Sequence, residues 1–480
     1  MVTHHSDPQP ASEEGAYRPR LRTALVLTGT GTAGAYHAGV LRALQEAGVK
    51  IDLIAAHGVG AGNALLAAID GAARLWEPKR VWRSRRVRRF YRWRPAVRAS
   101  FLTVAAGALV IGLPLLVLAT GLLIFPVGFA VGLFSPALGL RLQSTYVALV
   151  GRAFQPEMLP TILPRLALLT VAMVVAIVGA TALREFVARG DRRREHGPWW
   201  ARVLGAPWSA RDPAALFRDA LWQFLRGASQ LKQPPARDLA RRYAEVLGDN
   251  LGQPGFRELI IATHDVDARQ DLVFALLAEP LRRDFVRRGP FGMRRRPGDV
   301  MDLAGLGRDH VLDALAGCLS LPVLTDGHPI AFAIDSYWRG ETHRLTDRSG
   351  AIMRLLDEVA AAGVRQVLVV SSAAERGLPH GLVARSLRFR ARVGEYLAAS
   401  EVASTRDALI SRRSLFESMF HIVPVHNPIG SLDFAGCRDD RSDRTYPLTE
   451  LIDRGYEDAY RQFIEPIVGA SGEKLTVRNP

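Results

Sequence analysis

The chain has 480 residues, 48% of them apolar, and its 62 lysines and arginines outnumber its 47 acidic residues, so the formal net charge is +15. The apolar content excludes a disordered protein, and the length allows one large domain together with additional segments. The only two cysteines, Cys318 and Cys437, are too few and too distant in sequence for a disulfide framework or a zinc site. We therefore expect reduced thiols and no bound metal.

Residues 1–20 are polar and include two histidines and three prolines. They lack the apolar run that a secretory signal needs. We expect a disordered tail here, followed by the first part of a folded domain over residues 21–78. Without a secretory signal, this domain should stay in the cytoplasm.

A short strand predicted over residues 23–28 leads into a glycine-rich loop and then into a helical pattern. Backbone amides at such a loop suit a negative oxygen, either of a phosphate or of a tetrahedral oxyanion. The G-x-G-x-x-G spacing of the loop also fits dinucleotide binding, which requires an acidic residue at the end of the next strand. The nearest candidate, Asp52, stands at the start of that strand, over residues 51–56. Dinucleotide binding is therefore the weaker alternative.

A second glycine turn, G-V-G-A-G at residues 58–62, follows this strand. The two glycine motifs in this register resemble those of the patatin-like phospholipases. The resemblance implies that the first loop supplies an oxyanion hole and that the second turn carries a nucleophilic serine as G-x-S-x-G. Here Gly60 stands at the serine position, between the elbow glycines Gly58 and Gly62, and Ala33 replaces a usual basic residue. The oxyanion-hole glycines implied by the resemblance are Gly29, Gly31 and Gly34.

Ten basic residues and no acidic residue lie within the segment 79–98. The interleaved aromatic residues could follow a nucleic acid, but the segment runs directly into an apolar stretch, which favours an anionic membrane surface. We predict a basic juxtamembrane segment, with membrane lipids and especially anionic headgroups as partners and no nucleic acid. The sequence does not identify a protein partner.

Residues 99–140 contain no charge, and this length exceeds the roughly 20 apolar residues that one membrane-spanning helix needs. We predict a transmembrane insertion over 99–195, with spans near 101–124 and 166–183. Prolines interrupt residues 125–140, which either re-enter the bilayer or lie at its surface. A tight helical hairpin over residues 99–140 is the alternative. For 166–183, whose length is borderline, a buried core helix is the alternative.

Arginines flank the insertion at both ends, so both flanks should be cytoplasmic. The sequence on either side belongs to one predicted domain, which independently requires an even number of crossings. We therefore expect an integral membrane protein, of the inner (cytoplasmic) membrane if the source is bacterial, with its α/β domain in the cytoplasm.

Helix and strand patterns over residues 212–467 predict the second part of the same domain, before a tail at 468–480. The patatin resemblance implies a Ser-Asp dyad without histidine, and it places the acid at Asp347. Asp326, in an Asp-Gly pair, is the alternative, and either aspartate could instead be a turn residue bonded to its own backbone. His57 beside the elbow is the candidate base if a bound water replaces the missing serine.

These observations predict an α/β fold: a patatin-like three-layer α/β/α domain interrupted by a helical transmembrane insertion. The predicted function is lipid-related, in a protein whose catalysis is impaired because Gly60 replaces the serine. Asp347 would then be the remnant acid of the dyad. The alternatives are an acyl hydrolase with an unrecognised nucleophile or an activated water, and a dinucleotide-binding membrane enzyme. The preferred prediction, a lipid-related protein with impaired catalysis, requires no cofactor.

Overall fold

The computed structural model describes residues 17–155, 162–188, 205–289, 298–374, 388–425, 427–438 and 443–468. The chain divides into two compact units, one formed by residues 1–91 and 209–480 and the other by residues 92–208. The predicted tails lie mostly outside the described residues. Tyr17, within the tail predicted over 1–20, is nevertheless buried, and its hydroxyl bonds to the backbone of Lys50.

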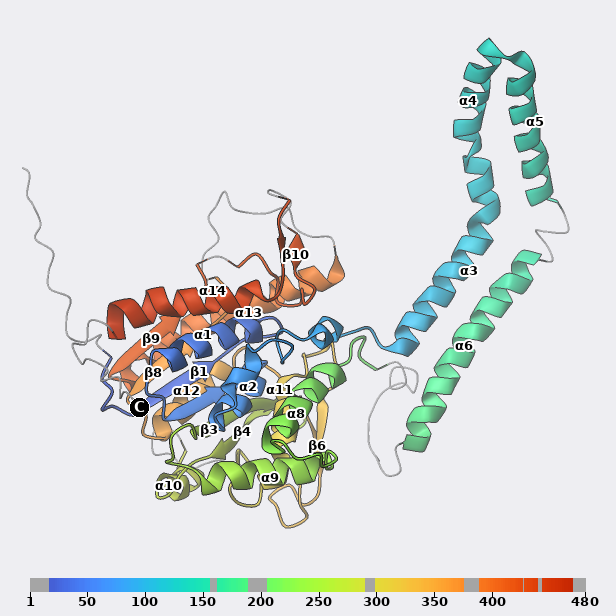
Figure 1. Ribbon diagram of the computed structural model, residues 1–480. Helices are drawn as coiled ribbons and strands as arrows, with labels where there is room; N and C mark the ends of the chain where they lie inside the picture. The colour runs from blue at the N-terminus through green and yellow to red at the C-terminus, as the bar shows by residue number, and fades with distance from the viewer. Residues whose placement is uncertain are drawn as a thin grey trace, which may run out of the picture. The chain divides into compact units, whose positions relative to one another are not determined.

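The first unit contains one mixed sheet (Figure 1). Its strands are β1 (Thr23–Leu27), β2 (Leu53–Ala56), β3 (Glu258–Asp265), β4 (Gln270–Leu276), β5 (Val300–Asp302), β6 (His328–Ala331), β7 (Thr342–Thr346), β8 (Gln366–Val370) and β9 (Ser418–Ile422). They follow the order β5-β4-β3-β2-β1-β8-β9, with β7 paired to both β3 and β6. The run from β3 to β9 is parallel, so the carboxyl ends of these strands meet at one edge of the sheet.

Helices cover both faces of this sheet. They are α1 (Ala33–Glu46), α2 (Gly60–Ala68), α8 (Arg211–Leu225), α9 (Ala236–Asp249), α10 (Leu281–Arg287), α11 (Val311–Cys318), α12 (Ala351–Ala361), α13 (Phe389–Arg412) and α14 (Glu450–Ala459). Successive residues of a strand point to opposite faces. Ala24 and Val26 of β1 therefore join a core with α12 and α13, whereas Leu27 approaches α2 on the other face. The predicted α/β layering is confirmed.

The long helix α13 and the strand β9 were not predicted from the sequence. The buried residues of α13 are Gly394, Glu401, Thr405 and Ala408, which include no large apolar side chain. A hydrophobic stripe is the main sequence signal of an amphipathic helix, and this helix does not carry one.

The second unit is a helical arm of α3 (Pro95–Ala119), α4 (Gly121–Phe134), α5 (Pro136–Ala153) and α6 (Leu163–Ala188). Helix α4 packs antiparallel to α5, and α3 packs antiparallel to α6 (Figure 1). At the base of the arm Trp93 pairs with Trp208, and the Arg94 N–H donates to the Pro207 carbonyl at 3.0 Å. The chain therefore leaves for the arm and returns from it at one point.

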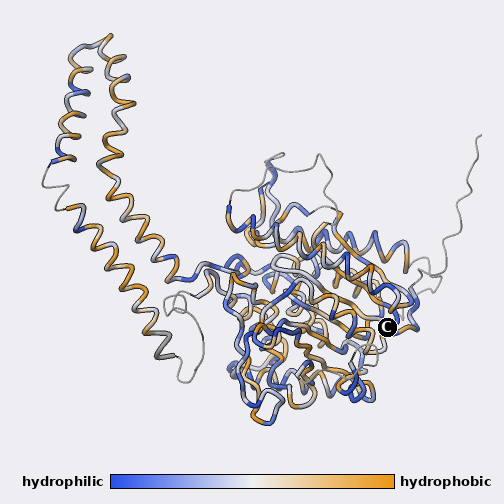
Figure 2. The backbone as a smooth tube through the Cα atoms, turned by 180° about the vertical axis from the view of Figure 1, so that it is seen from behind, coloured by the Kyte–Doolittle hydropathy of each residue, from blue (hydrophilic) through white to orange (hydrophobic). Residues whose placement is uncertain are grey.

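Three stretches of the arm are long and apolar enough to cross a membrane: Pro95–Leu113, Leu115–Phe134 and Pro164–Leu183. The predicted span 101–124 straddles the junction of α3 and α4. Helices α4 and α5 form a helical hairpin over residues 121–153 that turns at Ser135, so residues 125–140 hold its turn. The buried-helix alternative for 166–183 is wrong, because no residue of the third stretch is buried. Figure 2 shows the hydrophobic residues along this arm.

Candidate functional site

The elbow lies between the end of β2 and the start of α2. Gly58 has a φ of 58°, in the left-handed region that glycine adopts most readily. A β-carbon at Gly58 would lie 3.0 Å from Oδ2 of Asp347 and 2.3 Å from the carbonyl oxygen of Gly29. A β-carbon at Gly60, already inside α2, would lie 2.5 Å from the backbone oxygen of Leu27. Position 58, rather than the expected position 60, therefore faces the acid.

The two remaining glycines of the turn serve close packing. Gly60 lets the first turn of α2 approach the backbone of β1, and a β-carbon at Gly62 would lie 2.6 Å from the ring of Phe217. Both glycines of the elbow motif are present only with position 60 as the nucleophile, because with position 58 the first glycine is replaced by Ala56. The end of β2 at Ala56 and the position of Asp347 nevertheless favour position 58.

Asp347 follows β7 and is 5% exposed. Its N–H donates to the carbonyl of Ser320 at 2.8 Å, and its Oδ1 lies 3.3 Å from Nδ1 of His57. Asp326, the alternative acid, is exposed in the turn before β6. The fold therefore brings Asp347, His57 and Gly58 together, although 290 positions separate Asp347 from His57.

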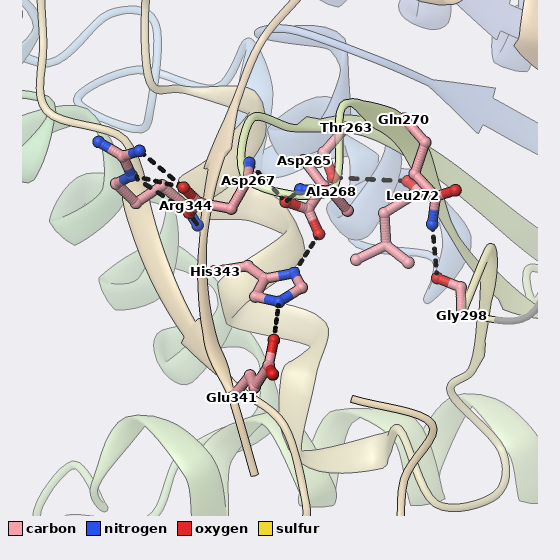
Figure 3. Close-up of polar contacts among 10 residues, drawn as sticks. All are labelled: Thr263, Asp265, Asp267, Ala268, Gln270, Leu272, Gly298, Glu341, His343 and Arg344. Atoms are coloured by element: carbon pink, nitrogen blue, oxygen red, sulfur yellow. Dashed lines mark hydrogen bonds and ion pairs between the residues drawn. The ribbon is translucent and has the colours of Figure 1, made fainter. Parts of the chain in front are cut away.

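A second buried pair holds the strand that carries this acid (Figure 3). Nδ1 of His343 on β7 lies 2.6 Å from Oδ2 of Asp265, at the end of β3. The exposed Glu341 lies 3.3 Å from the other ring nitrogen. Arg344 contacts Asp267 through both its backbone N–H and its guanidinium group (Figure 3). These contacts fix β7 against the β3–β4 turn, four residues before Asp347.

The glycine loop and the elbow share backbone hydrogen bonds. The Val59 N–H, directly after the elbow residue, donates to the Gly29 carbonyl at 2.9 Å. The Thr32 N–H donates to the Ser431 carbonyl at 2.8 Å, and the Thr32 hydroxyl donates to the Gly430 carbonyl at 3.1 Å. Two amides at this edge, those of Val59 and Thr32, are thus occupied by carbonyl groups of the chain itself.

Glu401 of α13 also enters this site. Its carboxylate accepts a hydrogen bond from the Thr28 hydroxyl at 3.2 Å and interacts with the backbone N–H of Thr30. The side chain is buried, next to Gly29. A carboxylate belonging to the protein therefore sits at the glycine loop, where a hydrolase would stabilise a developing negative charge. Sequence reasoning missed Glu401 because no motif surrounds it and α13 was not predicted.

The charges of the site are coupled. Burial, with a smaller contribution from the nearby charge of Asp347, raises the pKa of Glu401 to about 7. Burial alone would lower the pKa of His57, but the hydrogen bond and charge of Asp347, with Glu401 and Asp271, raise it above its ordinary value. Burial, together with His57, lowers the pKa of His37 to about 3. Three carboxylates therefore favour a protonated His57, while His37 stays neutral.

The dinucleotide alternative does not fit this geometry. Asp52 lies at the amino end of β2, where it accepts the Thr23 N–H at 2.9 Å, whereas the glycine loop lies at the carboxyl end of the neighbouring parallel strand. A β-carbon at Gly31 would collide with the Ser431 carbonyl, so the protein itself covers this loop. Among the described residues, no group of three or more His, Cys, Asp or Glu is arranged to hold a metal ion.

The Patatin-like phospholipase family model matches residues 25–347. The chain belongs to the patatin-like phospholipase family. The match begins in β1 and ends at Asp347, so it includes the glycine loop, the elbow and the acid of this patatin-like chain. A search of curated proteins found no match. A crystal structure of VipD from Legionella pneumophila is similar with a TM-score of 0.32 and 13% identity, over 96% of this chain and 69% of that chain.

Proposed function

We propose that this patatin-like protein binds lipid at a membrane and does not hydrolyse it. The observation that carries the proposal is that Gly58, which faces Asp347, offers no nucleophilic oxygen. A hydrolase with a serine nucleophile forms its covalent intermediate on the serine oxygen at this position, and glycine has no side chain to replace it. Asp347 would then be the remnant acid of the dyad, with no hydroxyl to deprotonate.

The filled oxyanion site supports the same proposal. The Gly29 carbonyl accepts the Val59 N–H, and the Ser431 carbonyl accepts the Thr32 N–H. Loss of even one oxyanion donor typically slows an acyl hydrolase by about a hundredfold or more. A water activated by His57 would therefore lack both a positioned nucleophile and transition-state stabilisation.

The arm supports membrane anchoring. Its three apolar stretches are almost entirely exposed. Exposed apolar surface of this length is stable in the hydrocarbon core of a bilayer and not in water. Since the chain returns to its starting point at Trp93 and Trp208, an even number of crossings would keep both flanks on one side. We propose that this side is the cytoplasm, because the basic flanks follow the positive-inside rule.

Labelling of the purified full chain in detergent with a fluorophosphonate probe tests the missing nucleophile. We expect no labelling and no phospholipid hydrolysis. The variants Gly58→Ser and Gly60→Ser test the register, because a serine at 58 would lie beside Asp347 and a serine at 60 would lie against Leu27. Labelling should be gained only at position 58. Turnover by the unmodified protein that Asp347→Ala abolishes would overturn the proposal.

An acyl hydrolase with a different nucleophile is the second candidate, and one observation favours it. The Oγ of Ser371, directly after β8, lies 2.8 Å from Nε2 of His421 on β9. Both residues lie towards the carboxyl edge of the same sheet, and His421 could accept the proton as Ser371 attacks an ester carbonyl. Fluorophosphonate labelling that Ser371→Ala abolishes, and Asp347→Ala leaves unchanged, would establish this candidate in place of the first.

A further inference from the structure

A cavity of about 180 Å³ in the first unit is separate from the elbow and rich in basic side chains. Its wall comes from two segments of the chain, residues 74–86 and residues 216–223. The lining residues are Arg74, Lys79, Arg80, Val81, Ser84, Arg86, Leu216, Asp219, Ala220 and Gln223. Four cations thus face one carboxylate across a concave surface.

The positive charge of this cavity is only partly compensated. Arg86 pairs with Asp219 at 2.9 Å, and Arg80 lies 3.5 Å from Glu77 outside the cavity. Within the described part of the chain, Arg74 and Lys79 have no acidic group within the 4.0 Å of an ion pair. These two side chains therefore leave cationic donors available to an anion from outside the protein.

The wall that carries these cations is held in place. The Val81 N–H donates to the Arg74 carbonyl at 3.1 Å and so closes the loop between them. The next residue, Trp82, is buried, and its indole N–H donates to Asn63 of α2 at 3.0 Å. The Ser84 oxygen accepts the Arg86 N–H, while its hydroxyl proton remains able to donate. The cavity is thus anchored to the helix that follows the elbow.

The two segments that form the cavity are also the segments that flank the arm. Arg86 stands nine residues before Pro95, where α3 begins, and Leu216 stands eight residues after Trp208, where the arm ends. A fully extended chain of nine residues spans at most about 30 Å. If the arm enters a bilayer, both walls of the cavity are tethered close to the headgroup layer.

We propose that this cavity binds the phosphate group of an anionic phospholipid. Arg74 and Lys79 are the principal donors, Arg80 and Ser84 complete the set, and Asp219 orients Arg86. The lipid source of the phosphate rests on the proposed membrane anchoring, whereas binding of a phosphate anion does not. The proposal is independent of whether the elbow hydrolyses esters.

Thermal unfolding of the full chain in a non-ionic detergent tests the proposal, with dihexanoyl phosphatidic acid, dihexanoyl phosphatidylcholine and inorganic phosphate as separate probes. Ligand that binds only the folded state raises the unfolding temperature, and above the Kd this stabilisation grows with the logarithm of the ligand concentration. We expect this for phosphatidic acid and not for phosphatidylcholine. The double variant Arg74→Gln/Lys79→Gln should raise the apparent Kd by about tenfold or more, because it removes two charged donors.

The matched control is Arg88→Gln/Arg89→Gln, which removes the same charge from exposed residues outside the cavity. It should leave the apparent Kd within about twofold, as expected for screened surface charges. Equal weakening by both double variants, or no rise in the unfolding temperature with phosphatidic acid, would overturn the site. Inorganic phosphate with the same apparent Kd as phosphatidic acid would overturn the lipid source. A failed binding test would leave the labelling test at Gly58 unaffected, so the two proposals can fail separately.

Discussion

The sheet edge around Gly58 and the helical arm place polar and apolar groups in opposite ways. At the sheet edge Asp347, His57 and Glu401 are buried and interact with one another. On the arm Leu122 is 81% exposed and Phe134 is 93% exposed. The first region encloses polar groups that water would solvate, and the second exposes apolar groups that water disfavours. This contrast teaches that the protein itself encloses the polar groups around Gly58, while it leaves the apolar side chains of the arm uncovered, as the proposed membrane anchoring requires.

Removal of the arm should have the largest effect on this contrast. Replacing residues 95–206 by a short glycine-asparagine turn would join Arg94 to Pro207, which are already hydrogen-bonded. We expect the shortened chain to move completely from the membrane pellet to the soluble fraction after carbonate extraction, because its large apolar surface is gone. Retention in the pellet would show that the first unit holds the membrane by itself.

The pH dependence of stability sharpens the description of the buried edge. The folded pKa of Glu401, about 7, exceeds the ordinary value of 4.5, so folding favours the protonated acid. Stability from this group is fully present below pH 4.5 and is lost as pH rises towards 7. The raised pKa of His57 acts in the same direction, with loss as pH rises above 6.5.

We therefore expect Glu401→Gln to be more stable than the unmodified chain at pH 8, by up to about 3 kcal/mol at about 1.4 kcal/mol per pKa unit. The difference should shrink towards pH 4.5. Denaturant unfolding in detergent, followed by tryptophan fluorescence across this pH range, measures it. The control is Glu395→Gln, at an exposed position of the same helix. It should change the unfolding free energy only slightly, and by the same amount at every pH. A parallel response of both variants would exclude Glu401 as the titrating group.

Close packing around Gly58 should have the smallest effect among these three predictions, and it is measured by the unfolding free energy of alanine variants. Gly58→Ala requires a left-handed backbone and also collides with the Gly29 carbonyl, whereas Gly48→Ala meets a similar φ of 66° with no atom within 4 Å. We expect Gly48→Ala to cost about 1 kcal/mol of unfolding free energy and Gly58→Ala about 2 kcal/mol more. Equal losses, measured by denaturant unfolding, would show that the Gly29 carbonyl moves away freely.

Much of the sheet could be predicted because its signals are local. Helix α12 and strand β3, for example, lie within residues 212–467, where the sequence predicts helices and strands of the same domain. The arm could be predicted because an uncharged run longer than a membrane span has few other interpretations. The position of the turn in the arm could not be predicted from the sequence. The prolines at 114, 126 and 136 are equally compatible with a break in the helix, and the structure places the turn at Ser135, which ends α4 in an extended conformation.

By itself the sequence determined the family resemblance, the split of the domain by an apolar insertion, the absence of an elbow serine and the choice of Asp347 as the acid. These features depend on residue type and order along short stretches. Only the tertiary structure decided that Gly58 faces Asp347, since the complete glycine motif in the sequence favours position 60 and only the end of β2 and the packing of Asp347 favour position 58. It alone brought Glu401 to Thr28, 373 positions away, because burial and a distant helix, with no local pattern, place that charge.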